Sequence, residues 1–320
     1  MAVQSVGVGP MFGWVFDAFR TVKRNFGAMI GASAVMLGVF MLMLLPMWLL
    51  VFSMVRRNGA AGLAGGALPM AGDMGMFIGV YGFTILASLL LFPPLMAGWF
   101  RLARDADHGG AISAFDVLKP YRDGELWFRG LRFALLAFVL YMAVVAVLFL
   151  VFHGSISAFM QQVIAQQAAT LAGTTPPPPS FPAGVVLAYF AFLLIGMLLQ
   201  FVYLVGFAEV SLRKTPALEA MRLAMLATLK NALKLLLFAF VTFSAIGAIF
   251  FVVILVLVLL GAVLALINPA LAAIVAIAFY IPFLLCIYPL MFVGGYFAWK
   301  DMLNDGSAAN PADPGTTLAV

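Results

Sequence analysis

Few residues of this chain could support chemistry, and the most unusual of them lie inside apolar stretches. Glu209 is the only acidic residue near the interior of such a stretch, and Gln200 precedes it in the same stretch. A carboxylate within a membrane can bind a proton or an ion, and an amide can join helices by hydrogen bonds. Because Arg213 and Lys214 follow closely, we predict that Glu209 forms an ion pair at the membrane edge. Gln200 is predicted to join two helices.

The largest group of polar side chains occupies residues 101–129, between two apolar segments. His108 stands here among acidic residues, and such a group could carry out acid–base catalysis. No nucleophile motif and no phosphate-binding glycine loop accompanies it. The two histidines and the single cysteine also lack the spacing of metal ligands. We therefore interpret this stretch as a solvated loop crossed by ion pairs, and we predict no enzyme activity, no cofactor and no metal site.

The elements that carry these residues are predicted to be membrane spans. The chain has 320 residues, of which 65% are hydrophobic and 9% are charged, whereas a soluble globular chain is about half apolar and a quarter charged. A transmembrane helix needs about 20 mostly apolar residues. The segments that meet this requirement are 26–54, 76–100, 131–152, 183–208, 233–266 and 270–298. The predicted fold class is an all-α polytopic membrane protein with six transmembrane helices, and a separate short helix is expected on the outer surface at 155–173.

The distribution of basic residues predicts the orientation of the chain. Fifteen Lys and Arg residues fall on the face that holds both termini, and two, Arg56 and Arg57, fall on the other. Basic residues near span ends stay in the cytoplasm, so both termini are predicted to be cytoplasmic. The bases are too scattered to form a nucleic-acid groove. The expected divisions are an N-terminal tail (1–10), one membrane domain (11–303) and a disordered cytoplasmic tail (304–320).

Two stretches that precede spans are amphipathic. In "MFGWVFDAFRTVKRNFG" (11–27), apolar residues fall on one helical face and basic residues elsewhere; the main ones are Phe12, Phe16, Phe19, Arg20, Lys23 and Arg24. A second helix, begun by Thr215 and Pro216, has an apolar stripe made by Leu218, Met221, Met225 and Leu229. Such helices lie in the headgroup layer and favour anionic lipid. The same face could instead pack against the ends of the spans.

The chain contains a repeat. "PPLMAGWFRLARD" (93–105) and "YPLMFVGGYFAWKD" (288–301) each close a span that follows an amphipathic helix and a first span. Three tandem units of a surface helix and a membrane hairpin are predicted, and the middle one is looser because Pro120 interrupts its polar stretch. The units are 11–107, 108–213 and 214–303.

The repeated motifs supply further candidates for a functional site, which are Pro94, Gly98, Trp99, Pro289, Gly294 and Gly295. Such residues could build a ligand site from broken helices. Alternatively, proline bends the helices, glycine allows close packing, and Trp99, Tyr296 and Trp299 anchor at the lipid headgroups. We favour the second interpretation.

The stretches "GWVFDAFRTVKRNFG", "ALEAMRLAMLATLKN" and "YFAWKDML" resemble the YciC-like families of uncharacterised proteobacterial inner-membrane proteins. They resemble more distantly the membrane domain attached to some glycerophosphodiester phosphodiesterases. The resemblance covers about residues 10–305 and implies a six-helix inner-membrane protein without an established activity. The phosphodiesterase chemistry belongs to a separate soluble domain, so no catalytic residue is carried over.

Two functions remain open at this point. One is a scaffold or envelope-homeostasis factor that engages membrane lipid, a protein partner or a second copy of the chain. The alternative is a small transporter or lipid-handling permease. A water-filled cavity lined by Gln200, Thr84 or Glu209 would favour the alternative, whereas a dry core would favour the scaffold.

Overall fold

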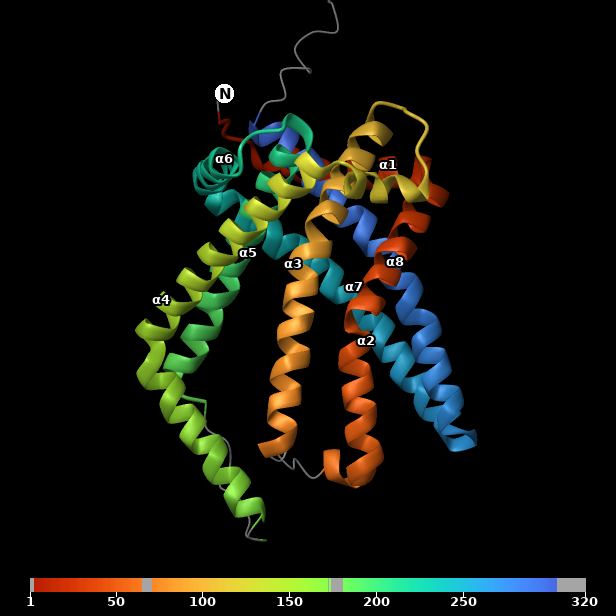
Figure 1. Ribbon diagram of the computed structural model, residues 1–320, viewed down its shortest axis with the longest axis vertical. Coiled ribbons are helices and arrows are strands. Elements are labelled where there is room, and N and C mark those ends of the chain that lie inside the picture. Colours follow the sequence, from red (N-terminus) through yellow and green to blue (C-terminus); the bar gives the residue numbers. More distant parts are fainter. Residues whose placement is uncertain (1–2, 65–70, 172, 174–180, 304–320) are drawn as a thin grey trace, which may run out of the picture.

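The computed structural model describes residues 3–64, 71–171, 173 and 181–303, and the regular structure in these ranges is helical (Figure 1). The elements in chain order are α1 (Val8–Arg24), α2 (Phe26–Ala64), α3 (Ala71–Asp107), the 3-10 helix η1 (Ala114–Arg122), α4 (Gly124–Leu171), α5 (Ala183–Arg213), α6 (Ala217–Lys230), α7 (Ala232–Ile267) and α8 (Pro269–Leu303). Six of these helices are long and apolar enough to cross a membrane. The predicted six-span, all-α architecture is confirmed.

The third span differs from its prediction. α4 runs without interruption to Leu171, so the separate surface helix expected at 155–173 is wrong. No proline lies between residues 124 and 171, and a single interior glycine such as Gly154 costs a helix only about 1 kcal/mol. The proline run at 176–179 and the predicted tail at 304–320 lie outside the described residues.

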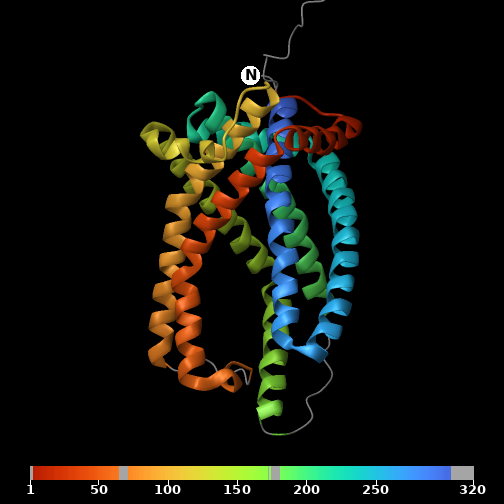
Figure 2. The same cartoon turned by 90° about the vertical axis from the view of Figure 1, so that its right-hand side faces the viewer.

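The helices form three hairpins, which pack together closely at one end of the molecule. The hairpins are α2–α3, α4–α5 and α7–α8, and α1, η1 and α6 lie across their upper ends (Figures 1 and 2). We call α1, η1 and α6 together the collar. The element order therefore follows the predicted plan of three units, each with one surface element and one hairpin. The middle surface element is a 3-10 helix that contains Pro120.

The three units close into a ring. Each collar element packs on the hairpin of the unit before it: η1 contacts α2 and α3, α6 contacts α4 and α5, and α1 contacts α8. The first helix of each hairpin follows the same rule, because α4 contacts α3, α7 contacts α5 and α2 contacts α8. The second helices, α3, α5 and α8, contact one another pairwise at the centre. The tandem repeat of the sequence thus has a cyclic arrangement in space.

The N-terminal segment secures the closure of this ring. The backbone N–H of Gln4 donates to the carbonyl of Met302 at 3.0 Å, at the end of α8. The backbone N–H of Val6 donates to Oδ1 of Asn231 at 2.9 Å, and Nζ of Lys234 donates to the carbonyl of Val6 at 2.9 Å. Residues of the predicted N-terminal tail (1–10) therefore join the first unit to the third. Helix α1 begins at Val8, ahead of the start predicted at residue 11.

The protein core lies at the collar end. Buried residues concentrate in the last turns of the central helices, at 95–106, 202–211 and 292–303, and in the collar. Farther from the collar the hairpins diverge (Figure 1), and most of their large apolar side chains are exposed. Lipid tails are as apolar as leucine, so these segments need no shared protein core.

Candidate functional site

Glu209 is fully buried where α5, α6 and α8 meet. Its Oε1 accepts a hydrogen bond from the Thr215 hydroxyl at 2.7 Å, and its Oε2 accepts one from Nε1 of Trp299 at 2.7 Å. An Arg213 nitrogen lies 3.7 Å from Oε2, and the same guanidinium covers the Trp299 ring at 5.1 Å from its centroid. The carboxylate thus has a counter-charge and two hydrogen-bond donors, as a buried charge requires.

This geometry alters the predicted role of Glu209. The ion pair with Arg213 is present, but it is enclosed in the core instead of lying exposed at the membrane edge. Thr215 was predicted to begin the second amphipathic helix. Instead its hydroxyl donates to Glu209, and Pro216 occupies the N-cap position of α6. Sequence reasoning missed Trp299 as a partner, since no local pattern links residues 90 positions apart.

Carboxylates with aromatic donors recur at the ends of the other two central helices. Asp107, at the end of α3, accepts a hydrogen bond from the Tyr296 hydroxyl at 3.1 Å and an ion pair from Lys300 at 2.8 Å. Asp301, near the end of α8, accepts a hydrogen bond from Nε1 of Trp14 at 2.7 Å. Glu209 and Asp107 thus join α5 and α3 to α8, and Asp301 joins α8 to the collar helix α1. All three carboxylates lie near the collar ends of the central helices.

The predicted headgroup anchors are wrong. Trp99, Tyr296 and Trp299 are each buried, because the collar and the neighbouring central helices cover them. Trp99 stacks on Phe292 at 5.1 Å between ring centroids, and its Nε1 contacts the Met36 sulfur at 3.1 Å. These rings fill the core of the collar end and do not reach the lipid headgroups.

The proline and glycine candidates of the repeated motifs do not all lie at close helix contacts. Gly98 lies against the backbone of η1, so an added Cβ would stand 2.0 Å from the carbonyl oxygen of Val117. A Cβ on Gly295 would make ordinary contacts at 3.5 Å, and one on Gly294 would meet nothing within 4 Å. Pro94 and Pro289 are buried inside α3 and α8. None of these residues lines either of the two cavities described below.

The surface helix α1 has two apolar faces. One packs on the core through Met11, Trp14, Ala18 and Val22. The other points outward: Phe16 is 69% exposed and Phe19 is 58% exposed, whereas Phe12 is partly buried. The sequence predicted a single apolar face for α1, but its apolar residues divide between a buried face and an adjacent exposed face. Arg20 and Lys23 are exposed beside the phenylalanines, whereas Arg24 donates to the carbonyl of Ala106.

The other collar elements repeat this division. α6 packs through a face of small residues that includes Ala220, Ala224 and Ala227. Of its predicted stripe, Met221 is buried, but Leu218 is 71% exposed and Leu229 is 64% exposed. Sequence reasoning missed the alanine face because alanine gives a weak hydropathy signal. On η1, Phe115 is 69% exposed.

The hydrophilic stretch 101–129 contains several ion pairs, as predicted. Arg101 contacts Asp123 at 3.2 Å, and Lys119 contacts Asp116 at 3.0 Å. The backbone N–H of Leu126, and then the Arg101 guanidinium, hold the pKa of Asp123 below its ordinary value. This interaction is present above the ordinary carboxyl pKa and is lost as the pH falls through the folded value. Asp123 thereby fixes the start of α4 against the end of α3.

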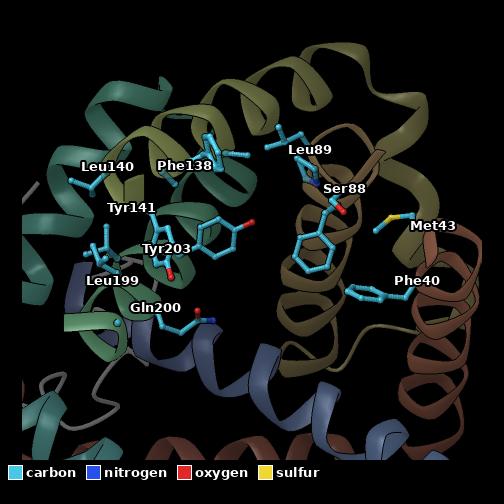
Figure 3. Close-up of a pocket in the computed structure, with 16 residues that line it drawn as sticks. Phe40, Met43, Ser88, Leu89, Phe138, Leu140, Tyr141, Leu199, Gln200 and Tyr203 are labelled. Carbon is cyan, nitrogen blue, oxygen red and sulfur yellow. The ribbon is translucent and has the colours of Figure 1, made fainter. Parts of the chain in front are cut away.

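A cavity of about 440 Å³ lies between the first two hairpins, within the span region. Its walls come from α2, α3, α4 and α5 and are mostly apolar (Figure 3). Gln200 lines it and has no hydrogen-bond partner among the described residues, so the predicted link between helices is wrong. Thr84 lines a neighbouring cavity and donates to its own helix at Val80. Glu209 lines neither cavity, so two of the three residues named for the transporter alternative line cavities, and the walls of both cavities are mostly apolar.

No family model matches the sequence, and no curated protein and no solved structure is significantly similar to it. The collar, the buried joints and the cavity are therefore the features that bear on its function.

Proposed function

We propose that this protein is a non-enzymatic scaffold of a bacterial inner membrane, and that its collar engages anionic lipid in the cytoplasmic leaflet. The observation that supports this most directly is the second, outward-facing apolar stripe of the collar. Phe16, Phe115 and Leu218, from the three collar elements, are each about 70% exposed. The resemblance to YciC-like inner-membrane proteins bears on the location in this proposal and not on the activity.

The position of the collar supports lipid as the partner. It crosses the ends of six apolar helices (Figure 2), so its outer apolar side chains lie level with the headgroups of a surrounding bilayer. Amphipathic helices at this depth bury their apolar face at the boundary of headgroups and acyl chains. The collar end also carries the larger share of Lys and Arg, which are attracted to an anionic leaflet.

The orientation that this function requires can be tested with single cysteines in a Cys286→Ala background. Ala111 is exposed at the collar end, and Ala168 is exposed near the far end of α4. In spheroplasts, an impermeant thiol reagent should label Ala168→Cys and should label Ala111→Cys only after lysis. Labelling of Ala111→Cys in sealed spheroplasts would place the collar outside and refute the proposal.

Removing collar charges should weaken the preference for anionic lipid. Arg20, Lys23 and Arg222 are exposed, and no protein contact of Lys23 or Arg222 is seen among the described residues. Replacing all three by Gln should cost about 1 kcal/mol of anionic-lipid attraction per charge at low salt. The measurement is the enrichment of phosphatidylglycerol over phosphatidylcholine in the lipid shell, in mixed nanodiscs, as a function of ionic strength.

The matched control is Arg56→Gln, because Arg56 is also exposed but lies at the opposite end of the spans. This variant should keep the collar's lipid preference. An unchanged preference for anionic lipid in the triple collar variant would contradict the proposed lipid role of the collar. A protein would then be the better candidate for the partner of the outer stripe.

A further inference from the structure

The cavity between the first two hairpins has polar groups that the protein itself leaves unused. Gln200, Tyr203 and Tyr141 line it, and none has a hydrogen-bond partner among the described residues. Gln200 and Tyr203 project from α5, across the cavity from Ser88 of α3 and Phe40 of α2 (Figure 3). Together these side chains provide one amide and two hydroxyls that can form hydrogen bonds with a ligand in the cavity.

These groups lie too deep to meet the headgroups of ordinary phospholipids. Gln200 precedes Glu209 by nine residues in the continuous helix α5, which is about 14 Å at 1.5 Å per residue. Glu209 is level with the collar, since it bonds Thr215 just before α6. The hydrocarbon layer is about 30 Å thick, so the amide lies near its middle. An acyl chain has no atom that can form a hydrogen bond with the amide at that depth. A polar group without a hydrogen bond there costs free energy.

The walls of the cavity favour a flat apolar ring. Aromatic side chains face it from four helices, and these are Phe40, Phe92, Phe138, Tyr141 and Tyr203. Aromatic rings pack well by offset stacking or edge-to-face contact. The volume of about 440 Å³ falls in the range of roughly 300–1,000 Å³ that is typical of small-molecule sites.

A second cavity of about 420 Å³ extends the first. The two share Ser88, Leu89 and Phe138, and the second continues along α2 and α3 past Leu44 and Met47. Its walls are again mainly apolar. A ring in the first cavity could therefore carry a long apolar chain that runs through the second.

We propose that the cavity between the first two hairpins binds a membrane quinone, a flat ring with hydrogen-bond-accepting carbonyl oxygens and an apolar chain. The carbonyl oxygens accept hydrogen bonds from the Gln200 amide and the Tyr203 or Tyr141 hydroxyl, and the aromatic side chains pack against the ring. The site binds the quinone without reacting with it. This inference is independent of the collar, whose lipid contacts lie outside the cavity.

The test uses the full chain in phosphatidylcholine nanodiscs, with empty nanodiscs as the blank. Decylubiquinone is the probe, and decylbenzene, which has the same chain but no carbonyls, is the comparison compound. Bound compound is quantified by chromatography after separation from free compound. Decylubiquinone should saturate the protein, and decylbenzene should bind at least about tenfold more weakly because it leaves the amide and hydroxyls unpaired.

Two variants assign the binding to this site. Gln200→Leu removes the amide and keeps the side-chain size, so it should weaken decylubiquinone binding about fivefold to tenfold and leave decylbenzene unchanged. Gly196→Phe should abolish binding, because Gly196 lines the cavity and an added Cβ there meets nothing within 4 Å. The control is Gly247→Phe on α7, where a Cβ also meets nothing within 4 Å and which lines neither of these two cavities.

Three outcomes would overturn the proposal. Equal binding of the two compounds would show that the polar groups take no part. Unchanged decylubiquinone binding in both Gln200→Leu and Gly196→Phe would place the quinone elsewhere. Tightly retained phospholipid that only Gly196→Phe releases, with no quinone binding to the unmodified chain, would make the cavity an acyl-chain site. If the collar showed no preference for anionic lipid, none of these quinone-binding results would change.

Discussion

Glu209→Gln should destabilise the protein by about 3–5 kcal/mol, the cost of removing one partner of a buried ion pair. The amide leaves the Arg213 guanidinium without its counter-charge. It also offers only one acceptor to the two donors that now bond the carboxylate, the Thr215 hydroxyl and Nε1 of Trp299. The measurement is reversible unfolding in mixed micelles, followed by tryptophan fluorescence.

Asp17→Asn provides the control for this variant. Asp17 pairs with Arg20 on the surface of α1, and both side chains are well exposed, so this loss should cost less than about 1 kcal/mol. Equal stability of Glu209→Gln and the unmodified chain would mean that the enclosed ion pair has no structural role. It would also match the small energetic effect expected of the exposed boundary pair that the sequence predicted.

Gly98→Ala should destabilise the collar end by about 3 kcal/mol, the upper part of the usual range for overpacking a tight core. The added Cβ would stand 2.0 Å from the carbonyl oxygen of Val117 and 2.8 Å from its Cα. Because these atoms are backbone, no side-chain rotation can make room, and η1 must separate from α3. Thermal unfolding in detergent measures the effect.

Gly294→Ala is the matched variant in the corresponding motif of the third unit. An added Cβ meets nothing within 4 Å there, and alanine is favoured over glycine within a helix by roughly 0.5–1 kcal/mol. This variant should therefore be slightly stabilised. A similar loss of stability in both variants would indicate a general requirement for glycine in these motifs, and not close contact with η1.

The exposed and buried faces of the collar explain why part of the fold could not be predicted. Hydropathy reports how strongly a side chain avoids water, but a protein core and a lipid tail are both apolar. The sequence therefore indicated that Phe16 and Leu218 avoid water, without showing whether protein or lipid would cover them. The alanine face of α6 gave almost no signal, although it forms that helix's contact with the core.

The sequence by itself determined the features that depend on local composition and periodicity. These are the six spans, the amphipathic helices, the two motifs that close the first and last units, and the local ion pair between Glu209 and Arg213, which lie one helical turn apart. Each can be inferred from neighbouring residues, because span length and helical faces repeat over short distances.

Only the tertiary structure decided the features that join distant segments. Ring closure brings Gln4 to Met302, and the central packing brings Trp299 to Glu209, so a predicted surface pair became a buried joint. The divergence of the hairpins left Gln200 facing a cavity instead of a neighbouring helix. The physical reason is that burial depends on which helices meet and at what angle, and in a chain whose spans are all apolar, hydropathy does not specify those contacts.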